Sequence, residues 1–115
     1  MATNTYSILG QSTPVSSNAD LLPVPGSTQA VVSTIAICNT TSSSATATVY
    51  VRKASGTTPA AAAAANALLF NAPIAGNTTQ TLSLGITLGA YDTITVASGT
   101  ANALTFHAFG SLVTA

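Results

Sequence analysis

The stretch that decides the fold runs from Val31 to Lys53 and reads VVSTIAICNTTSSSATATVYVRK. Its apolar residues keep a period of two in VVSTIAIC and again in ATATVYVR, and the polar cluster NTTSSS separates the two blocks. Such alternation over short runs rich in β-branched residues is typical of strands that bury one face. The pattern predicts a first strand with two faces, Ser33, Ile35 and Ile37 on one and Val32, Thr34, Ala36 and Cys38 on the other.

The same period recurs along the rest of the chain. Leu82, Leu84 and Ile86 alternate with small polar residues, as do Ile94 and Val96, while the block from Leu104 to Phe109 places Leu104, Phe106 and Ala108 on one face. Weaker strand candidates are Thr5 to Leu9, Leu68 to Ile74, and Ala19 to Val24, which Pro23 and Pro25 limit to an edge or a strand end. About eight short strands separated by turn clusters predict an all-β fold. We expect a single antiparallel β-sandwich or jelly-roll-like domain over residues 1–115.

One segment competes with this interpretation. From Pro59 to Phe70 the sequence reads PAAAAAANALLF, in which the best helix-forming residue is repeated behind a proline suited to a first helical turn. A helix this short is marginal in water, however, and the run has no amphipathic stripe that could pack. We therefore expect a compact surface loop with at most one helical turn.

The chain is almost free of charge. Charged residues make up 3% of it, against about 25% in ordinary soluble domains, and they are Asp20, Arg52, Lys53 and Asp92. With no net charge there is no basic surface for phosphates, so neither nucleic acid nor an anionic membrane is an expected partner. No apolar stretch is long enough to cross a bilayer, and the first residues lack the features of a signal peptide, so no export is expected.

Residues for chemistry are few. Cys38, His107 and Asp92 are the types that a nucleophilic triad uses, but nothing in their spacing brings them together, and we expect no enzyme. One His, one Cys and two separated carboxylates do not supply a metal site, and no cofactor is expected. Cys38 is predicted to be a small buried hydrophobe, and the Asn-x-Thr sequences at Asn39 and Asn77 are interpreted as turns.

What remains is a surface of hydroxyl and methyl groups, since the chain contains 20 Thr, 13 Ser, 7 Asn and 22 Ala. Neutral copies do not repel one another at long range, and small side chains lose little rotamer entropy in a contact. The composition therefore favours a permanent assembly over a regulated encounter.

Several segments together resemble a family of small virion proteins of tailed bacteriophages. The resemblance covers residues 9–110 and rests on LGQ at Leu9, LLPVP at Leu21, AVVSTIAICN at Ala30, VYVR at Val49, APIAGNTTQTLSLGITLGAYDTITV at Ala72 and FHAFG at Phe106. It implies strands of a β-sandwich present in many copies on the particle, and none of the matching residues is catalytic. The alanine run departs from the family, whose members carry charged and aromatic residues there, which puts a partner contact through this loop in doubt.

The resemblance implies a role in the virion. Taken together with the neutral surface, it leads us to expect a capsid decoration (cement) protein, a homo-oligomer, expected to be a trimer, bound to the major capsid protein or another virion protein. Such a protein would be found in the virion, after assembly in the host cytoplasm. The alternatives are a small tail, neck or fibre component and a glycan- or receptor-binding module built on Tyr50. Residues 1–9 are expected to form an N-terminal arm or an edge strand. The candidate assembly contacts are Tyr6, Ile8, Leu9, Tyr50 and Arg52.

Overall fold

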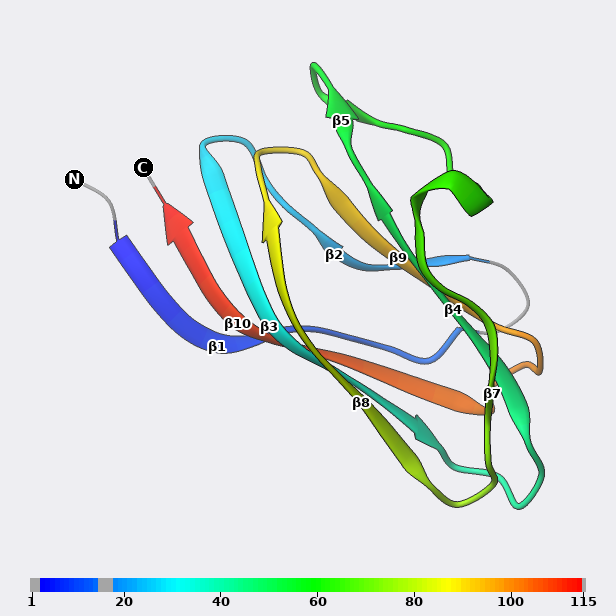
Figure 1. The fold of residues 1–115 in the computed structure, drawn as a ribbon. Helices are drawn as coiled ribbons and strands as arrows, with labels where there is room; N and C mark the ends of the chain where they lie inside the picture. Colours follow the sequence, from blue (N-terminus) through cyan, green and yellow to red (C-terminus); the bar gives the residue numbers. More distant parts are fainter. Residues whose placement is uncertain (1–2, 15–17, 115) are drawn as a thin grey trace.

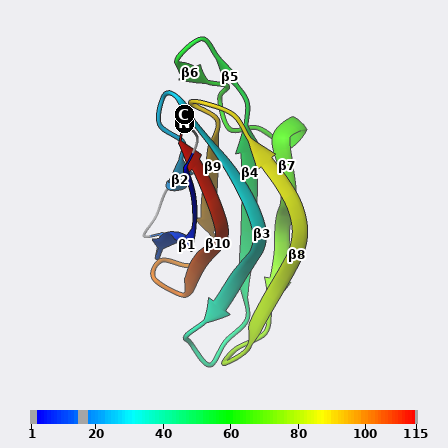
Figure 2. The ribbon, with the colours of Figure 1, turned by 90° about the vertical axis from the view of Figure 1, so that its left-hand side faces the viewer.

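Two four-stranded antiparallel sheets pack face to face (Figures 1 and 2). The structure is a computed structural model and describes residues 3–14 and 18–114. The eight strands of the two sheets are β1 (Thr3–Ser12), β2 (Ala19–Pro23), β3 (Thr28–Asn39), β4 (Ala45–Arg52), β7 (Ala67–Ile74), β8 (Thr79–Leu88), β9 (Thr93–Ser98) and β10 (Leu104–Thr114). A small hairpin of β5 (Ala54–Ser55) and β6 (Thr58–Pro59) stands apart from them.

The strand order is that of a jelly roll. We call the sheet with the order β1-β10-β3-β8 sheet A and the sheet with the order β2-β9-β4-β7 sheet B. The chain passes from one sheet to the other at every connection between these eight strands except that from β4 to β7. Eight antiparallel strands wound in this way define the jelly-roll form of the sandwich, so the predicted fold class is confirmed.

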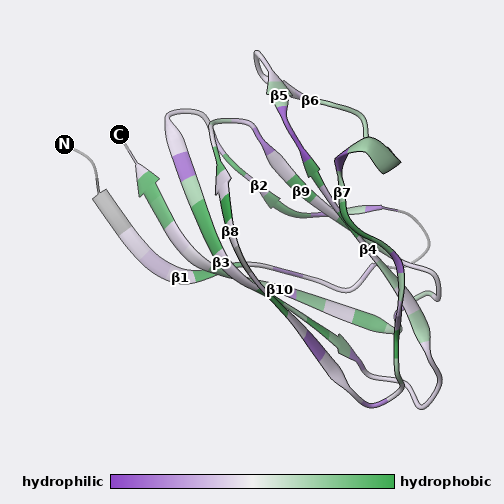
Figure 3. Ribbon diagram, in the orientation of Figure 1, coloured by the Kyte–Doolittle hydropathy of each residue, from purple (hydrophilic) through white to green (hydrophobic). Residues whose placement is uncertain are grey.

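Apolar side chains from both sheets fill the space between them. Ile94 and Val96 of β9, Ala47 and Val49 of β4, and Leu104, Phe106 and Ala108 of β10 are fully buried, as their period of two predicts. Figure 3 shows the alternation along β10 as green and pale segments. Burying one large side chain in such a core contributes about 1.5–3 kcal/mol.

The predicted faces of β3 are wrong at its first half. Val32 is fully buried, together with Ile35 and Ile37, while Ser33 is exposed. The register of β3 against β8 and β10 shifts around Ser33, which marks a β-bulge. One extra residue in a strand reverses the alternation beyond it, so Val32 and Ile35 lie on the same face although three positions separate them.

Cys38 also differs from its prediction, because it is half-buried on the outer face of sheet A and not in the core. The inward position next to it belongs to Ile37, which pairs with the buried Phe106, so the period of two turns Cys38 outward beside Thr105.

The alanine run is a surface loop with a single helical turn, as predicted. After β6, the chain forms a 3-10 turn, Ala64–Asn66, and enters β7 directly. The Asn66 side chain holds the turn, since its amide nitrogen donates to the carbonyl of Ala61 and its oxygen accepts from the backbone nitrogen of Ala63. In the described part of the chain, no helix is long and apolar enough to cross a membrane.

Asn39 ends β3 and fastens the two sheets together at that end of the sandwich. Its side chain is 1% exposed and donates to the carbonyls of Ser43 (2.9 Å) and Ile74 (3.0 Å). Its oxygen accepts from both the backbone nitrogen and the hydroxyl of Thr41. Asn77 lies opposite in a turn of positive φ, and its backbone nitrogen donates to the carbonyl of Thr41. Asn77 is a turn residue, as predicted, whereas Asn39 is the last residue of β3 and only its side chain takes part in the turn that follows.

Candidate interaction surface

The outer face of sheet A is built without charge. None of its four strands contains an Asp, Glu, Lys or Arg. Because paired residues of neighbouring strands lie side by side on one face, the register assembles the outward side chains into rows. Three of these rows are Tyr6, Ser111, Val31 and Thr87; Ile8, Phe109, Thr34 and Ser83; and Gln11, His107, Ala36 and Thr81.

Apolar groups in these rows are open to solvent. Tyr6 is 80% exposed, Ile8 57% and Val31 43%. Phe109 is half-buried beside Ile8, and its ring stacks on that of His107 with the centroids 6.1 Å apart. The amide nitrogen of Gln11 lies 3.1 Å from Nδ1 of His107 and completes the row. An exposed apolar patch on a neutral sheet is typical of a surface that binds another protein.

The N-terminal half of β1 lies at the margin of the sandwich. Thr5, Tyr6, Ser7 and Ile8 are all exposed, although neighbouring side chains of a strand point to opposite faces. Neither face of this half-strand is therefore covered. Figure 1 shows it at one end of sheet A, beside the last part of β10.

The second half of β1 returns to the body of the protein. Leu9 packs against the core, and Gly10 approaches the carbonyl oxygen of Leu21 so closely that no Cβ would fit. A glycine at this position lets β1 pass directly against β2 of the other sheet.

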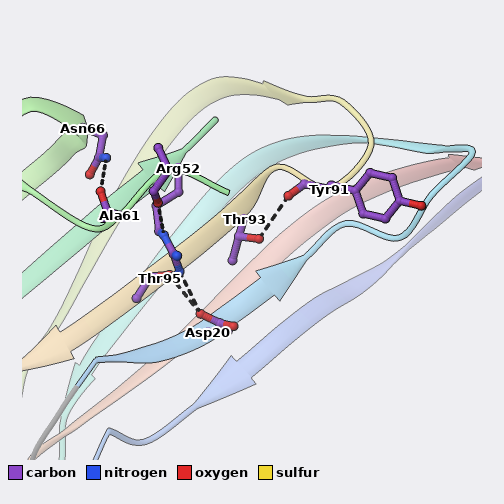
Figure 4. Close-up of polar contacts among 8 residues, drawn as sticks. Asp20, Arg52, Ala61, Asn66, Tyr91, Thr93 and Thr95 are labelled. Carbon is purple, nitrogen blue, oxygen red and sulfur yellow. Dashed lines mark hydrogen bonds and ion pairs between the residues drawn. The ribbon is translucent and has the colours of Figure 1, made fainter. Parts of the chain in front are cut away.

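The outer face of sheet B carries charge and is organised around Thr95, as Figure 4 shows. The Thr95 hydroxyl donates to Oδ1 of Asp20 at 3.0 Å and accepts from Nη1 of Arg52 at 3.1 Å. The ion pair between Arg52 and Asp20 is longer, at 3.5 Å. Thr95 is 2% exposed even though it points away from the core, because these two side chains cover it.

Arg52 also holds the loop that contains the alanine run. Its Nε donates to the carbonyl of Ala60 at 2.6 Å, and the 3-10 turn that follows contacts β4. A guanidinium presents several donors in one plane, so a single side chain can bind Asp20, Thr95 and the loop together.

The remaining acidic group stabilises a turn. Asp92 precedes β9 and accepts hydrogen bonds from the backbone nitrogens of Ala54 (2.8 Å) and Gly89 (2.9 Å). It thereby joins the small hairpin to the β8–β9 turn. All four charged residues of the chain consequently belong to sheet B or to the loops next to it.

The structure separates the candidate assembly contacts into two groups. Tyr6 and Ile8 share the outer face of sheet A, whereas Leu9 is half-buried against the core. Tyr50 and Arg52 lie on the outer face of sheet B, where Tyr50 pairs with Thr95. The two groups are therefore on opposite sides of the sandwich, and no one partner surface includes them all.

Cys38 and His107 are closer than their spacing in the sequence suggests. His107 pairs with Ala36 and Thr105 with Cys38, so the Cys and the His are diagonal neighbours on the outer face of sheet A. His107 is engaged by Phe109 and Gln11, however, and Asp92 belongs to the other side of the molecule. The three residues do not form a triad. Among the described residues, no group of three His, Cys, Asp or Glu could hold a metal ion.

Comparison with known proteins adds a fold likeness alone. No protein-family model and no curated protein matches this chain. Three solved structures align over nearly all of it: infectious bursal disease virus of the Gx strain (12% identity, 97% of this chain, TM-score 0.49), the same virus of the Gt strain (14%, 98%, 0.43), and the VP2 subviral particle of that virus (11%, 97%, 0.47). The chain spans about a third of the length of those proteins, at 31%, 28% and 32%. TM-scores below 0.5 at such identities carry no functional argument.

Sequence reasoning missed the separation of charge between the two sheets. The positions of Asp20, Arg52 and Asp92 were known, but strand order was not, and only the order assigns their strands to one sheet. A jelly roll alternates its strands between sheets in a set way, so applying that order to the predicted strands would have found the neutral face.

Proposed function

We propose that this chain is a non-enzymatic structural protein of a virus particle, a decoration protein that binds the outer shell as an oligomer. The observation that carries the proposal is the outer face of sheet A, which spans four strands without a charged residue and exposes Tyr6, Ile8 and Val31. Removing a neutral apolar face from water is favourable and depends little on ionic strength, which suits a permanent place in an assembly.

The mechanism would be mass action. A protein that binds only the assembled lattice adds its binding free energy to the stability of that lattice, and an oligomer attached at several points multiplies the effect. On this proposal the partners are other copies of the chain, as a trimer by the sequence-based expectation, and the major capsid protein or another virion protein. The resemblance to small virion proteins of tailed bacteriophages supports a phage particle assembled in the host cytoplasm.

Copy number tests the proposal against a tail, neck or fibre role. In purified particles separated on a stained gel, a decoration protein would be comparable in number to the shell subunits. A tail, neck or fibre component would amount to a small fraction of them. Absence from purified particles would overturn both interpretations.

Shell binding is tested with particles stripped of this protein. Adding the purified chain back should raise the temperature at which the particles release their genome, and a variant with Ile8→Lys should do so less well. A chain that binds the particles without changing that temperature would contradict the stabilising role.

The glycan-binding alternative predicts binding to a glycan array that Tyr50→Ala abolishes.

A further inference from the structure

The four edge strands of the sandwich are protected to very different degrees. An open edge exposes unpaired backbone N–H and C=O groups, which natural proteins shield with charge, proline, bulges or shortness. In sheet B, β2 is five residues long and carries Asp20 and Pro23, and β7 carries Pro73 and the positive-φ residue Asn71. Both edges of sheet B are therefore poor templates for another strand.

Sheet A has no such protection on β1. The strand extends over ten residues, is hydrogen-bonded to β10 alone among the strands of its sheet, and contains neither charge nor proline. From Thr3 to Ile8 its register against β10 is unbroken, and the first irregularity comes at Leu9. The other edge, β8, is interrupted in its middle, where two of its residues are skipped between Ser83 and Ile86. The first half of β1 is the longest regular open edge in the described chain.

We infer that this half-strand pairs with the same half-strand of a second copy of the chain, antiparallel and about a two-fold axis. We take the partner to be a second copy of the chain. A charged segment would lose hydration on pairing, and this edge has no opposite charge to offset that cost. The same edge of a second copy is equally neutral and has no such cost. A two-fold contact is also self-complementary, because each copy contributes the same surface. This inference rests on the proposed assembly role and specifies one surface through which copies of the chain would bind each other.

The side chains select the register. Across a two-fold axis perpendicular to the sheet, residues whose numbers add to an even value face each other on the same side. A sum of 14 places Tyr6 opposite Ile8 of the second copy and Ile8 opposite its Tyr6, with Ser7 facing Ser7 between them. These are two aromatic and β-branched pairs, the kind that stabilises neighbouring strands, and they cover the two most exposed large apolar side chains among the described residues. The two A sheets then join into one.

The contact is small, with far fewer residues than the roughly 20–30 a side of a standard interface. We therefore expect it to be weak between free molecules and strong where many copies are held side by side. It joins molecules in twos, so within a shell of trimers it would link neighbouring trimers.

Disulfide trapping tests the pairing and its register in the purified protein. In a Cys38→Ala background, Ser7→Cys places two thiols across the axis with Cα atoms roughly 4.5–5.5 Å apart, within the ~4.4–6.8 Å that a disulfide spans. Oxidised glutathione at high protein concentration should convert this variant into a covalent dimer. The matched control Thr5→Cys should remain monomeric, because its two thiols lie about 13 Å apart along the strands.

A second pair of variants tests the edge itself. Ile8→Lys, added to Ser7→Cys, should lower the rate of dimer formation about tenfold, because an edge lysine resists strand pairing. Phe70→Lys adds the same charge at an exposed apolar position of β7, an edge of the other sheet, and should leave the rate unchanged. Equal trapping of the Thr5 and Ser7 variants, or no trapping, would overturn the contact, and trapping through Tyr6→Cys alone would overturn the register. If the protein is abundant in particles but the Ser7→Cys variant is not trapped, only this contact is rejected. If the variant is trapped but the protein is absent from particles, the proposed function is rejected.

Discussion

The two outer faces of the sandwich differ in the side chains that they present to solvent. On sheet B, Arg52 binds Asp20, Thr95 and the loop at Ala60, so the face around Thr95 is covered by the protein's own side chains and loop. Exposed apolar side chains on this sheet, Leu68 and Phe70, belong to its edge strand β7. On sheet A, the strands offer only neutral side chains, and Tyr6 and Ile8 stay open to solvent. The difference indicates that the polar groups of sheet B serve folding, whereas the apolar groups of sheet A are available for contact.

The largest effect is expected where the two sheets are fastened together. Asn39→Ala should lower the free energy of unfolding by about 3 kcal/mol, because it removes four hydrogen bonds at a buried site. The carbonyl of Ile74 loses this donor, whereas that of Ser43 keeps the Thr41 hydroxyl. Urea unfolding measures the loss. Asn77→Gly is the control, since glycine accepts the positive φ of that turn and should change stability by less than about 0.5 kcal/mol. If Asn39→Ala left the free energy of unfolding unchanged, the packing of the two sheets would not depend on these hydrogen bonds.

A smaller loss is expected from the polar cluster of sheet B. Thr95→Val keeps the shape but removes the hydroxyl that joins Asp20 to Arg52, which should lower the free energy of unfolding by about 1–2 kcal/mol. Thr34→Val, the same change on the outer face of sheet A, should alter it by less than about 0.5 kcal/mol. Equal losses at the two sites, measured by thermal unfolding, would remove the contrast between the faces.

Arg52→Met should release the loop. The methionine keeps apolar bulk but loses the bond to Ala60, so we expect a cost of about 1 kcal/mol and faster trypsin cleavage after Lys53. Asp20→Asn is the control, because it weakens a half-exposed ion pair and leaves the loop bond in place. It should cost less than about 0.5 kcal/mol and leave the cleavage rate unchanged. If Arg52→Met is cleaved no faster than the parent, the loop is held by other contacts.

The smallest effect on folding is expected on sheet A. Replacing both Tyr6 and Ile8 with serine should change the free energy of unfolding by no more than about 0.5 kcal/mol, because both side chains are already exposed. The same variant should lose most of its binding to stripped particles, measured by co-sedimentation. A large loss of stability would mean that these side chains belong to the fold and not to a contact surface.

Much of the fold could be predicted because its signals are local. A period of two places Ile94, Val96 and Phe106 in the core without knowledge of their partners, and turn clusters mark the strand ends. The bulge at Ser33 could not be predicted, because it depends on how β3 pairs with β8 and β10. It reversed the expected face of Val32. Cys38 was misplaced for a simpler reason, because an apolar neighbourhood in sequence does not specify a face.

Less of the candidate surface could be predicted. The exposure of Tyr6 and Ile8 depends on how far β1 extends beyond the core, and the position of Tyr50 depends on which sheet receives β4. The predicted set therefore mixed residues of two opposite faces. Strand partners are chosen by contacts between distant parts of the chain, which no short window of sequence contains.

By itself the sequence determined an all-β chain with few charges, because side-chain period and composition are properties of each segment alone. Tertiary structure decided where the few charges went and which apolar groups stayed open. It did so through strand order, which brought Asp20 and Arg52 together on sheet B and left the first half of β1 at an open edge of sheet A. Pairing across the sandwich is a property of the whole chain, and it gave a nearly neutral composition one face with a paired polar cluster and one face without charge.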